Sequence, residues 1–573
     1  MIGSPYLVLR DFRVWFRKRR GFLQSLLQSE PAYVRAVDGI DLDVRKGEVF
    51  CLVGESGCGK TTTGKGILRL VEPTGGDVFV GAPGPVLAAY EEERARGATD
   101  ALEELRRKWS LSYKEKVRWG WTDYARFLLL AILGTVASAD ATVVALGPLV
   151  ADLGTADAGA LSAIILLFVA TGTIVAGIGT IPWVKARREM PFMLMLFAAL
   201  AGYLGNVAFI NAYLALPQWS VLIIGTQIVT ALASAWMAAR ALMGFWLSRR
   251  GIEADRLRKL RKSLQIIFQD PYESLNPKHS VRDIVSEPLI VNREGQSWAE
   301  IDARVRRALD DAGLRPPEDF LGRYPHELSG GQRQRVSIAG ALVLDPDFVV
   351  ADEPVSMLDV SIRTEILETL LELREKRGLT YLFITHDLSL AWVLADRIAV
   401  MYLGKIVEQG PTKEIVKTPR HPYTKALISV VPIPDPDRKH PRILLKGERP
   451  DPSNIPPGCR FHPRCPVAIE TCGWTAEELL DDLREIVAEA GGLGAHYLES
   501  AKAVGPSTLL LPTGADLWLK DLVPTRSESH RSLKAVEAVE PSGGSVTVSL
   551  HAFSEPSLKE IAPDVRVACH LVE

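Results

Sequence analysis

Three short apolar runs along the chain predict buried strands, and polar residues follow each of them. The runs are VFCLV (49–53), FVVA (348–351) and YLFIT (381–385). Continuous runs of this length are typical of central strands in a parallel sheet that is covered on both faces. In open α/β folds, ligands bind where such strands end. The pattern therefore predicts an α/β fold with a ligand site assembled from distant parts of the chain.

Four longer apolar runs lie between the first two of these strands, and each is long enough to span about 30 Å of hydrocarbon as a helix. They are Phe127–Val150, Leu161–Trp183, Phe192–Leu216 and Val221–Trp246. Basic residues precede the first run, separate the second from the third and follow the fourth, whereas the loops ADLGTADAGA and PQWS contain none. This alternation predicts four transmembrane helices that begin and end in the cytoplasm. Run length and loop charge disfavour the alternative of buried helices in a soluble domain.

Two charged residues lie within these runs, Asp140 and Arg240. Charges inside a membrane are costly enough to suggest function. Counted by rise per residue, however, the two differ in depth by on the order of 10 Å, so we do not pair them. Four spans are also few for a peptide-sized pathway. We therefore expect a membrane anchor or accessory domain.

The strand VFCLV leads into a glycine-rich loop, GESGCGKTT, which matches the pattern GxxxxGK[ST]. Gly54, Gly57 and Gly59 let the backbone fold around an anion so that successive N–H groups point inward. Lys60 adds charge for the β and γ phosphates, and the Thr61 hydroxyl can ligate Mg²⁺. The alternative, a glycine-rich surface turn, would match by chance in roughly 2% of chains this long. The loop therefore predicts a nucleoside triphosphate site.

Two carboxylates and a histidine follow the other two strands. Asp352 and Glu353 end the run FVVADE, and His386 comes directly after YLFIT. Asp352 can hold Mg²⁺, and Glu353 can orient and deprotonate the attacking water. A lone histidine is more often structural, but at this edge His386 is expected near the γ phosphate. These residues predict hydrolysis of the bound nucleotide.

A second candidate anion site is the sequence LSGGQ at residues 328–332, followed by RQRVSIAGALVL. Its serine and two glycines open an amphipathic helix whose free N–H groups can bind an anion. The chain already has a complete phosphate loop for its own nucleotide. This helix tip is therefore expected to serve the ATP of a partner subunit.

Taken together, these motifs resemble one known family, the ATP-binding subunits of ABC transporters of the oligopeptide/dipeptide importer type. The resemblance covers roughly residues 1–80 and 258–466. The matching segments are GESGCGKTT (54–62), IIFQDPYESLNP (266–277), HELSGGQRQR (326–335), ADEPVSMLD (351–359), ITHD with His386, GKIVEQGP (404–411), HPYTKAL (421–427) and GCRFHPRCP (458–466).

The resemblance implies a P-loop ABC-type ATPase core in which two nucleotide-binding domains close head to tail on two ATP molecules. It implies that Gln269 links the γ phosphate and Mg²⁺ to the membrane subunits. The expected catalytic residues are Glu353, His386 and Gln269, and the expected Mg²⁺ ligands are Thr61, Gln269 and Asp352. Tyr33 is a candidate for stacking on adenine, with Phe16 and Phe22 as alternatives. The other expected nucleotide contacts are Gly54, Glu55, Ser56, Gly57, Cys58, Gly59, Lys60, Thr61 and Thr62, and, for a partner's ATP, Ser329, Gly330, Gly331 and Gln332.

Composition adds two constraints. The chain has 573 residues, enough for three domains, and its 67 basic and 69 acidic side chains give no indication of nucleic acid binding. The N-terminus MIGSPYLVLRDF lacks the charged-then-apolar pattern of a signal peptide. With the predicted spans, this indicates a multi-pass protein of the cell membrane whose ATPase domain is cytoplasmic.

The partners implied by the resemblance are a second ABC ATPase subunit, two membrane permease subunits and an extracellular solute-binding protein.

Of the six cysteines, four lie near the C-terminus. Cys459, Cys465 and Cys472 fall in one short segment, and Cys569 is almost the last residue. A cytoplasmic setting disfavours disulfides, and four thiolates suit either an iron–sulfur cluster or zinc. The absence of CxxC weakens the zinc alternative. The resemblance implies a [4Fe–4S] cluster, although Cys569 is separated from the other three by residues 473–568, farther than is usual in that family.

The expected organisation has four parts. Residues 1–80 and 254–433 form the ABC ATPase domain, residues 81–253 the membrane insertion, and residues 434–573 an oligopeptide-transporter-type region with the cysteines. The fold class is thus α/β: a P-loop ABC-type ATPase core with a four-helix transmembrane insertion and a small C-terminal cysteine domain. Between the last cysteines, TAEELLDDLREIVAEA predicts an amphipathic helix without recognisable chemistry.

The expected function is ATP hydrolysis that drives uptake of oligopeptides or dipeptides. Alternatives are an ABC ATPase for another solute such as short oligosaccharides, or a self-contained exporter. A soluble ABC ATPase that acts on DNA or ribosomes would lack the apolar runs.

Overall fold

The structure, a computed structural model, describes residues 5–18, 33–97, 99–112, 260–292, 294–295, 297–431 and 442–572. The chain divides into two compact units, one of Met1–Tyr113 with Arg258–Glu573 and one of Lys114–Leu257. All described residues belong to the first unit. The expected boundaries of the four sequence segments remain predictions.

An eight-stranded sheet in the order β14-β15-β9-β8-β3-β7-β6-β5 forms the centre of the described chain. Strands β8, β3, β7, β6 and β5 pair in parallel, and β9, β15 and β14 extend the sheet antiparallel. The three strands predicted from apolar runs are confirmed as β3, β6 and β7, and all three are buried along their whole length. The bounds are β3 Val49–Val53, β5 Leu264–Ile267, β6 Phe348–Asp352, β7 Thr380–Thr385, β8 Arg397–Tyr402, β9 Lys405–Pro411, β14 Lys559–Ala562 and β15 Val565–Val567.

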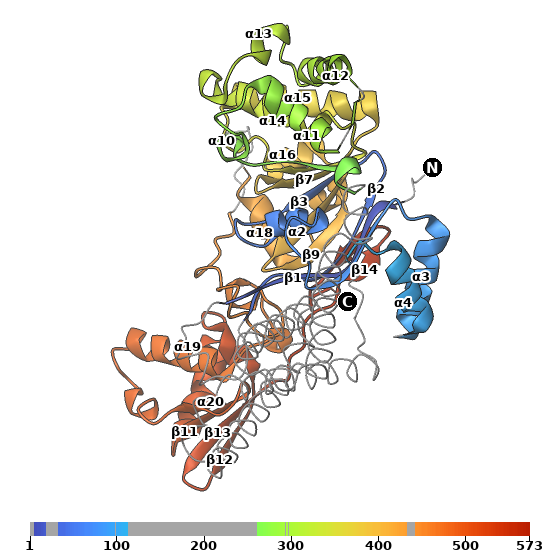
Figure 1. Cartoon of the computed structure of the whole chain (residues 1–573). Coiled ribbons are helices and arrows are strands. Elements are labelled where there is room, and N and C mark those ends of the chain that lie inside the picture. Colours follow the sequence, from blue (N-terminus) through green and yellow to red (C-terminus); the bar gives the residue numbers. More distant parts are fainter. Residues whose placement is uncertain are drawn as a thin grey trace, which may run out of the picture. The chain divides into compact units, whose positions relative to one another are not determined.

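Helices from both ends of the sequence pack on this sheet. Figure 1 shows α2 and β3, coloured blue, beside green and yellow elements that come after residue 260. The chain therefore folds by bringing distant segments together around the central strands. The helix bounds are α2 Lys60–Ile67, α10 Pro271–Ser274, α11 Val281–Asn292, α12 Trp298–Asp311, α13 Glu318–Leu321, α14 Gly330–Leu342, α15 Val360–Arg377, α16 Leu388–Leu394, α17 Thr412–Lys417 and α18 Pro422–Ser429.

A second sheet is antiparallel, in the order β2-β1-β4, with β1 Pro5–Arg17, β2 Tyr33–Arg45 and β4 Gly75–Val80. Helices α3 (Gly84–Arg96) and α4 (Asp100–Trp109) pack against it. Asp77, which is 2% exposed, accepts a hydrogen bond from the Tyr90 hydroxyl at 2.7 Å and pairs with Arg106 at 2.8 Å. This buried carboxylate ties both helices to β4.

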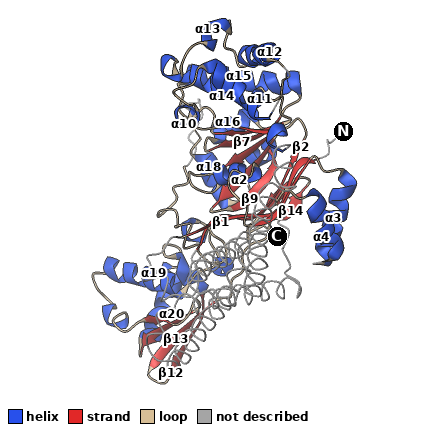
Figure 2. Ribbon diagram, in the orientation of Figure 1, coloured by secondary structure: helices blue, strands red, loops and turns tan. Residues whose placement is uncertain are grey.

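The C-terminal region contains a four-stranded antiparallel sheet, β10-β11-β13-β12, with helices α19 and α20 beside it (Figure 2). The bounds are α19 Ala476–Glu489, β10 Lys502–Ala503, β11 Thr508–Pro512, α20 Ala515–Arg526, β12 Val536–Ser542 and β13 Ser545–Leu550. The strands β14 and β15 that follow pair with β9 and so belong to the central sheet. The C-terminal region is thus more than a small cysteine domain.

The expected fold class is corrected on its membrane part. Within residues 5–112 and 260–572, apart from the short gaps given above, no helix is long and apolar enough to cross a membrane. The four predicted spans, with Asp140 and Arg240, lie outside the described residues. The four-helix transmembrane insertion is therefore not supported. The described residues support a P-loop α/β core and a C-terminal α+β region.

Candidate nucleotide-binding site

The glycine-rich loop joins the end of β3 to the start of α2, and its backbone requires glycine. Gly54, Gly57 and Gly59 have φ values of 159°, 75° and 111°. A Cβ at Gly54 would lie 2.2 Å from the Met401 carbonyl oxygen, and one at Gly59 would lie 2.1 Å from that of Ala36. Side chains at these two positions would clash with backbone, which cannot move aside. The loop is therefore held in one conformation by its neighbours.

Lys60 opens α2 and is 4% exposed. Its ammonium donates to the Gly54 carbonyl at 2.7 Å and to the Glu55 carbonyl at 3.0 Å. Burial of an ammonium is costly unless its protons are bonded, and the loop carbonyls meet that need. The charge is thus positioned at the centre of the loop.

Thr61 and Asp352 connect the loop to the end of β6. The Thr61 hydroxyl donates to Asp352 Oδ1 at 2.8 Å. Asp352 is 2% exposed, and burial raises the pKa of its carboxyl although the hydrogen bond from Thr61 opposes the shift. A hydroxyl and a carboxylate side by side are hard oxygen ligands of the kind that Mg²⁺ prefers.

Glu353, Gln269 and His386 meet at the same edge of the sheet. The Gln269 amide donates to Glu353 Oε2 at 3.1 Å, and His386 Nδ1 lies 3.1 Å from the same oxygen. Glu353 has φ 46° and donates its backbone N–H to the Ile384 carbonyl at 3.0 Å. A non-glycine residue in this region is strained by about 1–3 kcal/mol, and such strain gathers at functional sites. Glu353 comes directly after β6, and its side chain contributes to the cavity described next.

A cavity of 560 Å³ joins these groups. It includes the sequence-predicted Gln269, Glu353 and His386, and it adds Ala36, for which the sequence showed no signal, and Leu427, the last residue of the motif HPYTKAL. Gly54, Cys58 and Asp352 are buried beneath the lining. The lining residues are Ala36, Glu55, Ser56, Gly57, Gly59, Lys60, Thr61, Thr62, Gln269, Glu353, His386 and Leu427.

The other predicted residues lie elsewhere. Tyr33 begins β2 and its ring is 6.0 Å from that of Trp15, outside the cavity lining. Phe16 is 42% exposed on β1, and Phe22 lies outside the described residues. The helix tip at Ser329, Gly330, Gly331 and Gln332 does not line this cavity either.

That helix tip is built as an N-terminal cap. Ser329 precedes α14, and its hydroxyl accepts from the Gln332 N–H at 3.3 Å while the Gln332 side chain accepts from the Ser329 N–H at 3.0 Å. A Cβ at Gly331 would lie 2.6 Å from Ile362, so the helix start packs closely on α15. The tip is thus a formed element whose place is away from this chain's own cavity.

Comparison with known proteins identifies the family. A model of ABC transporters matches residues 37–119 and 242–356, and a model of the oligopeptide/dipeptide transporter C-terminal region matches residues 407–472. A putative peptide import ATP-binding protein of Brucella ovis is 46% identical over 228 residues, which are 40% of this chain and 71% of that protein. The chain belongs to the ABC transporter ATP-binding protein family.

Further relatives agree with this assignment and confirm the resemblance to oligopeptide/dipeptide importer subunits. The oligopeptide transport ATP-binding protein OppF of Salmonella typhimurium is 44% identical over 263 residues, 44% of this chain and 78% of that protein. The solved dimeric structure of MJ0796, a bacterial ABC transporter cassette, overlaps loosely, with 18% identity, a TM-score of 0.37 and coverage of 71% of this chain and 98% of that chain.

The C-terminal region of this ABC protein holds the outside of the phosphate loop. The Glu55 N–H donates to the Tyr423 hydroxyl at 3.0 Å. The Arg464 guanidinium donates to both Glu55 carboxylate oxygens, at 2.9 and 3.2 Å, and Arg449 donates to the Ser56 carbonyl. Such bidentate pairs are among the stronger polar contacts in proteins. The motifs HPYTKAL and FHPRCP, which the sequence showed only as family resemblance, therefore include residues that shape the loop.

The four C-terminal cysteines gather in one place. Burial raises the pKa values of Cys459 and Cys465 to about 12, and the nearby Cys472 and Cys569 add to both shifts. The Cys459 N–H donates to the Cys472 carbonyl at 2.8 Å and closes the segment into a loop. The fully buried His462 donates from Nδ1 to the Cys459 carbonyl at 2.8 Å, and its Nε2 lies 3.1 Å from Glu478 Oε1. The cysteine segment is thus ordered by its own backbone and by α19.

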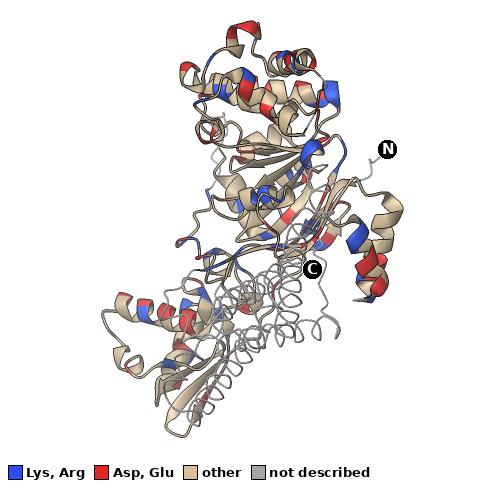
Figure 3. Cartoon of the chain, in the orientation of Figure 1, with Lys and Arg blue, Asp and Glu red and all other residues tan. Residues whose placement is uncertain are grey.

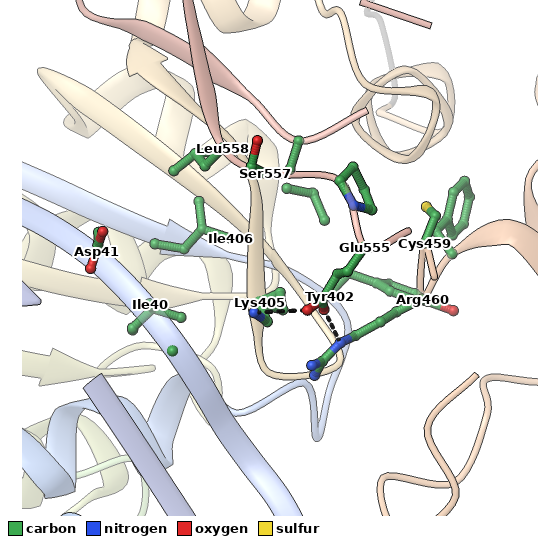
Figure 4. A pocket seen from close by; sticks show the side chains of 15 residues that line it. Ile40, Asp41, Tyr402, Lys405, Ile406, Cys459, Arg460, Glu555, Ser557 and Leu558 are labelled. Atoms are coloured by element: carbon green, nitrogen blue, oxygen red, sulfur yellow. Dashed lines mark hydrogen bonds and ion pairs between the residues drawn. The ribbon is translucent and has the colours of Figure 1, made fainter. Parts of the chain in front are cut away.

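A second cavity, of 380 Å³, lies beside Cys459 (Figure 4). Arg460 and Lys405 both reach Glu555, at 3.0 and 3.2 Å, and Arg460 also pairs with Asp38 at 2.5 Å. These charges neutralise one another. The cavity joins the segment around Glu555 to β2 and β9, and it contains none of the predicted nucleotide contacts.

Replacement of Arg464 by methionine is expected to weaken ATP binding about three- to ten-fold, since the loss of a half-buried bidentate pair costs on the order of 1 kcal/mol. The measurement is the ATP dissociation constant of the full chain, determined for R464M, E55Q and the double variant. In a double-mutant cycle the two changes should be strongly non-additive. Arg484→Met, which removes an exposed ion pair with Asp481, is the matched control. Additive effects would show that Arg464 does not act through Glu55.

Proposed function

We propose that this chain is the ATP-binding and ATP-hydrolysing subunit of an importer for oligopeptides or dipeptides. The observation that carries the proposal is the single cavity that joins the phosphate loop to Gln269, Glu353 and His386. Relatives that match over most of their own length are described as peptide import and oligopeptide transport ATP-binding proteins. Peptides are therefore favoured over short oligosaccharides as the transported solute.

The phosphates bind in the glycine-rich loop. Backbone N–H groups of Gly57, Gly59, Lys60, Thr61 and Thr62, at the loop and the N-terminus of α2, surround the anion, and Lys60 exchanges its loop carbonyls for phosphate oxygens. The negative charge of the phosphates is also stabilised by the positive end of the helix dipole at the N-terminus of α2. Binding therefore draws on groups that the fold has already oriented.

Thr61, Asp352 and Gln269 would hold Mg²⁺. Thr61 and Asp352 are already in contact, so their oxygens can share one ion with little rearrangement. When bound, the ion neutralises charge that develops on the β and γ phosphates. Burial raises the pKa of Asp352, and a cation held between Asp352 and Thr61 would favour the charged carboxylate and so oppose that shift.

Glu353 acts as the general base for the attacking water. Gln269 and His386 both bond to its Oε2. They orient the carboxylate and leave Oε1 to accept the proton from water. His386 has 57% of its side chain exposed on the cavity side of Glu353, where it can reach the γ phosphate. We infer a positioning role for Gln269 and His386 and the chemical step for Glu353.

A second ATP-binding subunit completes the site. The helix tip Ser329–Gln332 is formed but lies away from its own chain's cavity, which supports its use on the nucleotide of a neighbour. Head-to-tail closure of two such subunits encloses both nucleotides. Closure is transmitted to two membrane permease subunits, and an extracellular solute-binding protein delivers the peptide. The ATPase then works on the cytoplasmic side of a membrane-associated transporter.

Cys459, Cys465, Cys472 and Cys569 hold a [4Fe–4S] cluster in this proposal. A tetrahedral zinc site needs sulfur atoms about 3.8 Å apart, given a Zn–S distance near 2.3 Å. Among the described residues, the one group whose ligand atoms all lie within 4.8 Å of one another contains no cysteine. Every set of three of these sulfur atoms thus contains a pair more than 4.8 Å apart, which favours the larger cluster over a single zinc ion.

Glu353→Gln is expected to retain ATP binding within about two-fold and to lower the rate of hydrolysis by roughly 10²–10⁴, the usual contribution of a general base. With ATP, the variant should accumulate as a closed dimer, seen as a larger species by size-exclusion chromatography. Glu368→Gln, an exposed carboxylate on α15, is the matched control. Near-normal turnover in E353Q would remove Glu353 as the base.

Purification without oxygen is expected to give a brown protein with about four irons per chain. Cys465→Ser should lose the iron, whereas Cys58→Ser, which changes a buried thiol of the phosphate loop, should keep it. Metal analysis of the purified chains is the measurement. A colourless preparation without iron would rule out the cluster.

A further inference from the structure

Three side chains outside the nucleotide and cysteine sites converge in the C-terminal region. They are Glu485 and Glu489 of α19 and His530, which follows α20. One ligand atom from each lies within 4.8 Å of the other two. The residues come from two segments about 40 positions apart, so the fold, and not local sequence, brings them together.

His530 is buried and directed at the two carboxylates. The side chain is 6% exposed, and its Nε2 lies 3.9 Å from Glu485 Oε2 and 3.9 Å from Glu489 Oε1. Both distances are too long for a hydrogen bond. The other ring nitrogen, Nδ1, is 3.0 Å from the Ser529 hydroxyl. The contact at Nδ1 orients the ring so that Nε2 faces the carboxylates, as an outer partner does for a metal-binding histidine.

Glu485 and Glu489 lie near the C-terminal end of α19, where negative charge is unfavourable. They are four residues apart on one face of α19, so their like charges repel each other. Glu489 is the last residue of the helix, at the negative end of its dipole, and the last turn has no basic residue. Arg526 reaches Glu489 at 3.5 Å and offsets part of this charge, whereas Glu485 pairs with His530 alone in the described ion pairs. A bound cation would remove the repulsion.

The segment that carries His530 is fixed to α19 next to this cluster. The Ser532 hydroxyl, which is fully buried, donates to Asp482 Oδ2 at 2.6 Å, and the Ser532 N–H donates to the same oxygen at 3.2 Å. The neighbouring Arg531 donates to the Cys465 carbonyl. The position of the His530 ring is therefore fixed by the contacts of its neighbours Ser529 and Ser532. Acidic residues recur along α19 (Figure 3), but the buried histidine distinguishes this end of the helix.

We propose that Glu485, Glu489 and His530 bind a divalent transition-metal cation, and zinc is the ion that this set fits best. One imidazole nitrogen and two carboxylate oxygens form a ligand set that zinc accepts, with a fourth position left for water. Ligand atoms spaced within 4.8 Å need only small rotations to reach a shared ion at about 2.0–2.2 Å. The site is separate from the cysteines and does not depend on the proposed transport function.

Zinc binding to the full chain tests this proposal. After equilibrium dialysis against Zn²⁺, metal analysis should find one zinc per chain fewer in the double variant E485Q/E489Q than in the unmodified chain. The cysteines and the phosphate loop are unchanged in both, so any metal that they bind cancels in the difference. The control E477Q/D481N also removes two exposed carboxylates from α19 and should bind as much zinc as the unmodified chain. His530→Asn should lose the same single zinc.

Thermal unfolding gives a second readout that does not depend on counting metal. With a chelator present, E485Q/E489Q should unfold at the same temperature as the unmodified chain or slightly higher, because the substitution removes a repulsion. With Zn²⁺ the order should reverse, since an ion that binds only the folded state raises the midpoint. Equal zinc content in the two chains, or an equal rise of both midpoints with Zn²⁺, would overturn the proposal.

Discussion

The nucleotide-binding site depends on the close approach of three backbone segments: the phosphate loop, the end of β8 and strand β2. Gly54 lies against the end of β8, and Gly59 lies against β2. Each glycine is so close to this neighbour that an added methyl group would overlap a backbone carbonyl oxygen. Two hydrogen bonds lock the contact: the Gly404 N–H donates to the Cys58 carbonyl at 2.9 Å, and the Asp38 N–H donates to the Gly404 carbonyl at 2.9 Å. The turn after β8 thus connects the phosphate loop to strand β2 of the antiparallel sheet. Lys60 and Thr61 receive their positions from these contacts.

The meeting of Glu353 and His386 could be predicted from the sequence, because each follows an apolar run that predicts a strand of a parallel sheet, whereas Gln269 was implied only by the family resemblance. Gln269, Glu353 and His386 each come just after a strand, and those strands, β5, β6 and β7, are neighbours in the parallel sheet. Parallel neighbours end at the same edge, so polar residues at their ends must meet. The adenine-stacking role of Tyr33 was predicted from its residue type, and the transmembrane helices were predicted from hydropathy. Neither property tells which other parts of the chain lie next to a segment in the fold. The transmembrane insertion finds no support in the described helices, and Tyr33 lies outside the cavity.

The support of the loop from the C-terminal region could not be predicted in this way. Tyr423 and Arg464 contact Glu55 across 368 and 409 positions of sequence. Neither the hydrophobic periodicity nor the motif spacing of the sequence indicates these contacts. Because Arg464 precedes Cys465, the sequence around it points to metal binding and not to support of a phosphate loop. The rings of Tyr402, Tyr423 and Phe461 pack together with centroids 4.8–5.2 Å apart, and Arg464 donates to the Tyr402 hydroxyl at 3.5 Å. The cysteine segment therefore has a structural role at the nucleotide site whatever it binds.

Cys569 is far from the other three cysteines in sequence, and pairing of β15 with β9 brings it near them in the fold. The first three cysteines form a closed turn, in which a Cβ at Gly473 would lie 2.1 Å from the Pro457 carbonyl oxygen, and the chain leaves this turn to build α19, α20 and the four-stranded sheet. It returns because β15 adds to the edge of β9, where Val567 pairs with Glu408 and the Ala568 N–H donates to the Val407 carbonyl at 2.9 Å. An edge strand offers unpaired N–H and C=O groups that fix the register of any strand that joins it. Cys569 follows directly after this pairing, which explains how it lies near the other three cysteines although residues 473–568 separate it from Cys472.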